Sequence, residues 1–191
     1  MIRKILLLIS VVCSIQGCLP AIFVAGAATA GIVVYDNRSA KTIIDDRDIT
    51  FQLQGKFNSD PELSAKAHLS VTSFNRVALL VGQASSESLR QRAEDIVRSN
   101  PKVRIVYNEV VVVDKSLGLL DRTNDSWITT KVKTVLAATS GLNSTSLKIV
   151  TENRIVYLMG LTTKGQGGLA ADKARTVAGV NKVVKLFEYM N

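Results

Sequence analysis

One stretch of the chain occurs twice, and this duplication constrains the fold more than any other feature of the sequence. Segment 71–82 aligns with segment 149–160 at an offset of 78 residues, and both contain an Asn-Arg pair followed by an apolar run that ends in glycine. The offset becomes 79 upstream and 77 downstream, so it changes by one residue where loops are expected. Two copies indicate a tandem pair of domains, because a solenoid needs at least three repeats.

Each copy has the sequence pattern of helix, hairpin, helix and strand. Apolar residues with helical spacing predict a first helix in both copies: Ile49, Leu53 and Phe57, then Ile128, Val132, Val135 and Leu136. In copy one, apolar runs at 69–74 and 77–82 flank Asn75-Arg76 and predict a hairpin. The second helix is expected at 86–99 and at about 168–178, and the last strand at 104–113 and 182–190.

This order of elements, α-β-β-α-β, predicts the fold class α+β. In each copy a three-stranded mixed sheet packs on two helices, and the second helix makes the right-handed crossover between parallel strands. The predicted organisation of the chain is a signal peptide (1–17), an anchor and tether (18–44), domain 1 (45–113), a linker (114–123) and domain 2 (124–191).

The N-terminus has the pattern of a secretory signal. Basic Arg3 and Lys4 precede the apolar run 5–12, and the tetrad Ile-Gln-Gly-Cys ends at Cys18. This tetrad resembles the lipobox of bacterial lipoproteins, which implies that Cys18 becomes the first mature residue and carries acyl chains such as palmitate. Leu19 in place of aspartate then implies sorting to the outer membrane. An ordinary signal peptide with an unrelated cysteine is the alternative.

The scarcity of reactive side chains argues against an enzyme. Cys13 leaves with the signal and Cys18 is consumed by lipid, so no disulfide is expected. The single histidine, His68, has no acidic or cysteine neighbour, and no nucleophile is paired with a base. We therefore expect no catalytic residue, no metal and no cofactor.

Three other motifs have ordinary structural interpretations. Segment 165–168 lacks the ending of a phosphate loop and is expected to be a flexible turn. The acidic run 45–48 and its counterpart 124–126 are expected to cap the helices that follow them.

Charge and the only tryptophan distinguish copy two. Residues 45–112 hold nine acidic and nine basic side chains, whereas residues 124–191 hold four acidic and nine basic ones, a balance of +5. Trp127 aligns with Asp48, so its position is predicted to face solvent, and on a helix it shares a stripe with Thr130, Lys131 and Thr134. An indole beside a lysine suits a membrane interface, although Trp127 could instead pack back on its own helix or against copy one.

The element order, Gly82 and Gly160, and the run formed by Ala174, Val177, Gly179 and Val180 resemble the BON domain. A lipobox followed by two such domains is similar to the dual-BON outer-membrane lipoproteins. The resemblance implies a non-enzymatic lipoprotein in the outer membrane, facing the periplasm, that supports envelope integrity, with cell-division sites as one place of action. Its implied ligand is anionic phospholipid, phosphatidylglycerol or cardiolipin, and not nucleic acid. The implied binding residues are Trp127, Ile128, Thr130, Lys131, Thr134 and, on the flank, Lys133.

The alternative is a protein-interaction adaptor. Such a protein would serve outer-membrane protein assembly or the activation of septal peptidoglycan hydrolases, and its partners would be envelope proteins.

Overall fold

The computed structural model describes residues 36, 38–113 and 122–190. The predicted signal peptide, the anchor residue Cys18 and most of the predicted tether and linker lie outside the described residues. The first domain consists of α2 (Ala40–Ser59), α3 (Pro61–Lys66), β1 (Ala67–Phe74), β2 (Val77–Ala84), α4 (Glu87–Arg98) and β3 (Ile105–Val112). The second consists of α5 (Arg122–Ala137), η1 (Ser144–Ser146), β4 (Leu147–Glu152), β5 (Ile155–Thr162), α6 (Lys164–Arg175) and β6 (Lys182–Tyr189).

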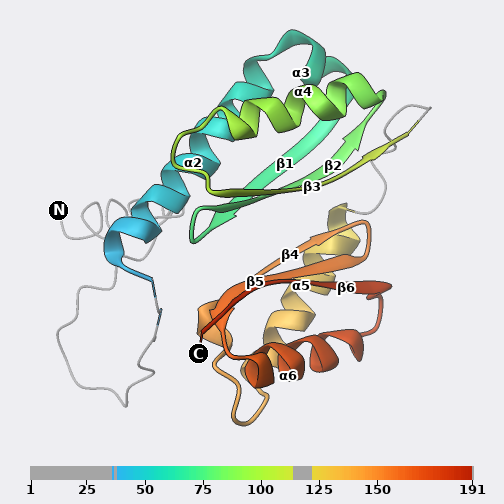
Figure 1. The fold of residues 1–191 in the computed structure, drawn as a ribbon. Coiled ribbons are helices and arrows are strands. Elements are labelled where there is room, and N and C mark those ends of the chain that lie inside the picture. The colour runs from blue at the N-terminus through green and yellow to red at the C-terminus, as the bar shows by residue number, and fades with distance from the viewer. Residues whose placement is uncertain (1–35, 37, 114–121, 191) are drawn as a thin grey trace, which may run out of the picture. The chain divides into compact units, whose positions relative to one another are not determined.

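Both domains have the same sheet topology, and the predicted fold class is confirmed. In the first sheet β2 lies between β1, to which it is antiparallel, and β3, to which it is parallel. The second sheet repeats this order with β4, β5 and β6. Figure 1 shows α2 and α4 on one face of the first sheet, and α5 and α6 on one face of the second.

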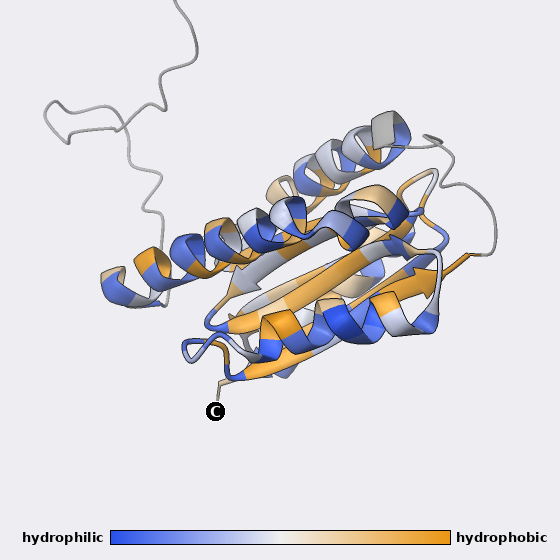
Figure 2. Ribbon diagram, turned by 90° about the horizontal axis from the view of Figure 1, so that it is seen from above, coloured by the Kyte–Doolittle hydropathy of each residue, from blue (hydrophilic) through white to orange (hydrophobic). Residues whose placement is uncertain are grey.

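The helices pack on the sheets through the predicted apolar stripes. Ile49, Leu53 and Phe57 of α2 are buried in the first core, and Ile128, Val132 and Leu136 of α5 are buried in the second. A further cluster joins the other faces of the two sheets, within the compact unit formed by residues 34–191. Its buried members are Phe74, Val77, Leu79, Val81, Tyr157, Met159 and Leu186. Figure 2 shows apolar strands between helices whose outer surfaces are largely hydrophilic.

The predicted hairpins turn at the two Asn-Arg pairs. Asn75, Arg76, Asn153 and Arg154 all have positive φ angles, between 48° and 62°. Two successive residues with positive φ form the type I′ turn, whose twist matches that of a two-stranded hairpin. The repeated Asn-Arg pair therefore fixes the register of both hairpins.

The prediction that the acidic run 45–48 caps a helix is wrong, whereas Asp125 of segment 124–126 does lie in the first turn of α5. Asp45 and Asp46 lie in the second turn of α2, and Ser39 is the residue that caps that helix. Asp46 instead accepts hydrogen bonds from the backbone N–H groups of Asn75 and Arg76, at 2.7 and 2.8 Å. The helix thus begins at Ala40, within the segment expected to be tether, and Asp46 reaches the hairpin turn from inside the helix.

The segment expected to be a flexible turn is helical. Helix α6 begins at Lys164 and not at Gly168, with the side chain of Thr163 accepting from the N–H of Gln166 as its cap. Gly167 is buried, and a Cβ on it would lie 2.8 Å from the ring of Phe187. One of the glycines is therefore required for close packing of α6 on β6.

The second strand of each hairpin is longer than predicted. Both β2 and β5 continue two residues past the glycines that were expected to end them, Gly82 and Gly160. Gly82 has a φ of 124°, and a Cβ there would lie 1.9 Å from the carbonyl oxygen of His68 on β1. The glycine permits close approach of the paired strand, so it lies within the strand and does not end it.

None of the helices in the described part of the chain is both long and apolar enough to cross a bilayer.

Candidate functional site

Helix α5 presents Trp127 to solvent. Trp127 is 59% exposed, while Ile128, the next residue, is 2% exposed and belongs to the core. The prediction that position 127 faces solvent is confirmed. Asp48, its counterpart on α2, forms an ion pair with Lys102 at 2.6 Å, as suits a surface position.

Lys131 lies directly over the indole. One helical turn separates Lys131 from Trp127, and the Lys131 Nζ is 3.1 Å from the centroid of the Trp127 ring. A cation above a tryptophan face is stabilised by about 0.5–1 kcal/mol at an exposed site. The contact holds a positive charge and an apolar ring together as one surface feature.

A largely apolar hollow of about 430 Å³ opens beside the indole, between α5 and the segment after α6. Its lining is Trp127, Thr130, Lys131, Thr134, Val135, Thr176, Val177 and Ala178. Thr130 donates to the carbonyl of Ser126, and Thr134 donates to the carbonyl of Thr130, both at 3.0 Å. Because these hydroxyls are satisfied within the helix, they require no polar partner from a ligand.

A smaller hollow of about 210 Å³ lies against the indole as well, and it adds a second cation. Arg154, from the turn between β4 and β5, lines it together with Asn124, Ile128, Ala178 and Gly179. The Asp125 carboxylate places Arg154, because it accepts from the N–H groups of Asn153 and Arg154 at 2.7 and 2.9 Å. Within the described residues Arg154 forms no ion pair, so its charge is available at this surface.

The structure brings together four of the residues that were expected to bind lipid. Trp127, Thr130, Lys131 and Thr134 line one hollow. Ile128 is buried beneath them and borders only the smaller hollow, while Lys133 is exposed and lines neither one. Cys18 lies outside the described residues.

The sequence predictions missed the residues that other segments contribute to this surface. Val177 and Ala178 follow α6, and Arg154 comes from a hairpin turn. The run formed by Ala174, Val177, Gly179 and Val180 was interpreted only as a family motif. Because this run lies at the end of the second helix of its domain, its position could have suggested a contact with α5.

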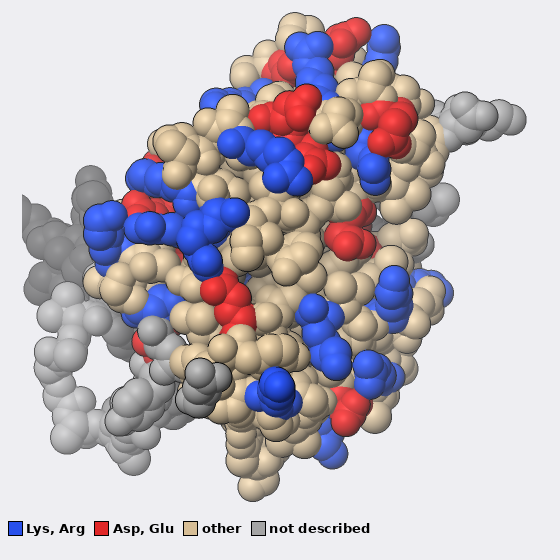
Figure 3. Space-filling view, in the orientation of Figure 1, with Lys and Arg blue, Asp and Glu red and all other residues tan. Residues whose placement is uncertain are grey.

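Charge on the visible face differs between the domains. Figure 3 shows acidic and basic side chains interspersed over the first domain, whereas basic side chains prevail over the second. The basic excess expected from the sequence is therefore displayed at the surface of the domain that carries Trp127. Among the described residues, no three His, Cys, Asp or Glu side chains are arranged to hold a metal ion.

Comparisons with known proteins agree with the geometry. Residues 45–114 and 124–191 each match the family model of the BON domain. The outer membrane lipoprotein DolP of Haemophilus influenzae is 32% identical over 190 residues, which cover 100% of this chain and 97% of that protein. A protein named 21 kDa hemolysin, from Actinobacillus pleuropneumoniae, is 36% identical over 155 residues, covering 81% of this chain and 79% of its own.

Proposed function

Because the chain belongs to the BON-domain family, as a DolP-like protein with two BON domains, we propose that it is a non-enzymatic lipoprotein of the bacterial outer membrane. In this proposal Cys18 carries the acyl anchor, the folded domains face the periplasm, and the second domain binds anionic phospholipid through α5. The name of the Haemophilus relative supports the location and the anchor. The role that follows is support of outer-membrane integrity, with cell-division sites as one place of action.

The observation that carries the lipid proposal is an exposed indole with a lysine on its face and an apolar hollow at its side. Trp127 is 59% exposed, and the Lys131 Nζ lies 3.1 Å from the centroid of its ring. Tryptophan favours the depth of the lipid headgroups, where its apolar body and its N–H are both accommodated. The ammonium group beside it meets lipid phosphate at the same depth.

Electrostatic attraction adds to the insertion of the indole. A basic side chain close to an anionic leaflet contributes on the order of 1 kcal/mol. Lys131 and Arg154 both lie beside the indole, on a domain whose charge balance is +5. A domain already tethered to the membrane needs only a few such contacts to select regions rich in anionic lipid.

Vesicle co-sedimentation of residues 19–191 tests this proposal without the anchor. We expect sedimentation with phosphatidylglycerol or cardiolipin vesicles, weakening as salt screens the charges, and little with phosphatidylcholine. Trp127→Glu should abolish binding, whereas Tyr189→Glu, the same kind of change at another exposed aromatic of domain two, should leave it intact. Binding that is absent, or that neither Trp127→Glu nor salt alters, would reject the lipid proposal and favour the protein-adaptor alternative.

A further inference from the structure

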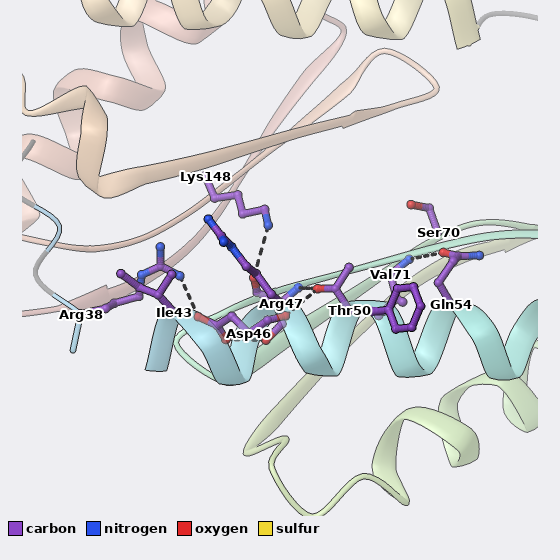
Figure 4. A pocket seen from close by; sticks show the side chains of 11 residues that line it. Arg38, Ile43, Asp46, Arg47, Thr50, Gln54, Ser70, Val71 and Lys148 are labelled. Carbon is purple, nitrogen blue, oxygen red and sulfur yellow. Dashed lines mark hydrogen bonds and ion pairs between the residues drawn. The ribbon is translucent and has the colours of Figure 1, made fainter. Parts of the chain in front are cut away.

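A second groove lies between the first domain and β4 of the second, and it shares no lining residue with the hollows beside Trp127. It has a volume of about 670 Å³ and runs along β1, between α2 and Lys148 of β4. Figure 4 shows Lys148 reaching toward α2 from β4, and Arg47 extending from α2 into the same space. Three cations, Arg38, Arg47 and Lys148, line the groove against a single carboxylate, that of Asp46.

That carboxylate is fully engaged by the protein. Asp46 accepts from Arg38 Nη1, from the Ser73 hydroxyl and from the N–H of Asn75 at 2.7 Å each, and from the N–H of Arg76 at 2.8 Å. An ionised carboxylate offers about four acceptor positions, and here all of them are filled. Asp46 therefore pairs with Arg38 and leaves the other two cations without an anion.

The ammonium group of Lys148 uses little of its hydrogen-bonding capacity. Its Nζ donates one hydrogen bond, to the carbonyl oxygen of Ser73 at 3.4 Å, although an ammonium group has three N–H donors. Burial lowers the pKa of Lys148, and the positive charges of Arg38, Lys133 and Arg47 lower it further against the opposing effect of Asp46. Arg47 is exposed and forms no hydrogen bond or ion pair within the described part of the chain. An anion in this groove would satisfy both cations.

The groove also has an apolar side. Phe51, on α2, is 81% exposed, and Ile43 and Val71 line the groove with it. Together, the exposed Phe51 and the half-buried Ile43 offer apolar surface to the hydrocarbon portion of a ligand.

An added peptide strand is a poor candidate for the occupant, because α2 already covers the open edge of β1. The Thr50 hydroxyl accepts from the N–H of Ser73 at 3.1 Å, and the Gln54 side-chain oxygen accepts from the N–H of Val71 at 3.4 Å. These N–H groups would have to pair with an incoming strand. The floor of the groove thus offers side-chain surface and not a free sheet edge.

We propose that this groove binds one single-chain anionic amphiphile, of the kind represented by an acidic lysophospholipid. Its phosphate lies between Arg47 and Lys148, and its hydrocarbon chain lies along Phe51. The volume of the groove falls within the roughly 300–1,000 Å³ typical of sites for one small molecule. This site is separate from the bilayer contact proposed for α5.

Photo-cross-linking of the full-length chain in phosphatidylcholine vesicles tests the proposal. The probe is lysophosphatidylglycerol with a photoactivatable group on its acyl chain, added in trace amount, and mass spectrometry locates the labelled peptides. We expect labelling within α2 near Phe51, about tenfold less labelling with the matching lysophosphatidylcholine probe, and no competition by inorganic phosphate. Labelling that does not depend on the headgroup, or that phosphate alone abolishes, would overturn the proposal.

Four variants separate this groove from the α5 surface. Combining Arg47→Gln with Lys148→Met should lower labelling of α2 about tenfold, whereas Lys185→Met, at an exposed position of β6, should not. Phe51→Glu, at a side chain that is 81% exposed, provides a second test if the double variant folds poorly. Trp127→Glu should leave labelling of α2 unchanged. If Trp127→Glu removes that label, or if the groove variants leave it in place, the groove is not the site.

Discussion

Asp46 and Asp125 occupy equivalent positions in the two domains, and each carboxylate holds both backbone N–H groups of its own hairpin turn. The four N···O distances lie between 2.7 and 2.9 Å. Because the turn residues have positive φ angles, these bonds stabilise a conformation that non-glycine residues otherwise avoid. One side chain in each domain thereby joins the first helix to the hairpin.

Asp125→Ala should strongly destabilise the second domain. The change leaves the N–H groups of Asn153 and Arg154 without a charged acceptor at a buried position, and a charge-assisted hydrogen bond contributes about 1.5–3 kcal/mol. Urea unfolding followed by circular dichroism measures the loss. Asp172→Ala is the control, because its side chain is 72% exposed and, among the described residues, its one ion pair is with Arg175. Equal stability losses in the two variants would contradict the role of Asp125 in holding the hairpin turn.

Two glycines of α6 should respond in opposite directions to alanine. Gly167→Ala places a methyl group 2.8 Å from the Phe187 ring and should destabilise by about 1–3 kcal/mol. Gly168→Ala meets nothing within 4 Å and should stabilise by up to about 1 kcal/mol through helix propensity. Thermal unfolding of both variants compares them directly. If Gly167→Ala also stabilised, the close approach of α6 to β6 would be disproved.

Acid should weaken the first domain through Asp45. Lys102, at 3.0 Å, and Arg76, at 2.8 Å, hold the pKa of this carboxyl well below its ordinary value. A depressed folded-state pKa means that the stabilisation is complete above the unfolded pKa, near 3.9, and is lost as the pH falls below it toward the folded value. Asp45→Asn should therefore unfold at lower urea concentration at pH 7 and show a flatter acid dependence below about pH 4. An acid dependence identical to that of the unaltered chain would refute this role.

Lys148→Met should leave the free energy of unfolding unchanged or raise it by about 1 kcal/mol at neutral pH. The lowered pKa means that the ammonium form is less stable in the folded chain than in the unfolded one, so removing the charge relieves a penalty. Its single weak hydrogen bond, to the carbonyl oxygen of Ser73 at 3.4 Å, contributes little to the free energy of unfolding. Lys185→Met is the matched control at an exposed site. A loss of stability well beyond that of the control would show that Lys148 is a structural cation.

Sequence reasoning predicted the elements whose signal is local and repeated. The stripe of Ile49, Leu53 and Phe57 predicted a buried helix face, and the Asn-Arg pairs predicted the turns, because periodicity and turn chemistry act over a few residues. Comparison of the two copies also predicted the exposure of Trp127, since the equivalent slot holds Asp48.

The errors have a common physical origin in tertiary contacts. Glycine composition suggested a loop at 165–168, yet packing against Phe187 makes one of those glycines part of a helix. The acidic residues were assigned to local caps, whereas Asp46 binds a turn about thirty residues away. Arg154 was missed because its approach to Trp127 depends on the hydrogen bonds that Asp125 accepts from the hairpin turn, which no local pattern reveals.

The intrinsic fluorescence of Trp127 tests the central claim most directly, because this is the only tryptophan of the chain. Residues 19–191 would be titrated with phosphatidylglycerol vesicles that carry bromine on their acyl chains, and with phosphatidylcholine vesicles as the control. The proposed function predicts a blue shift and quenching of the emission with the anionic vesicles alone. A chain that binds these vesicles while its tryptophan keeps the emission and quenching of an indole in water would contradict it.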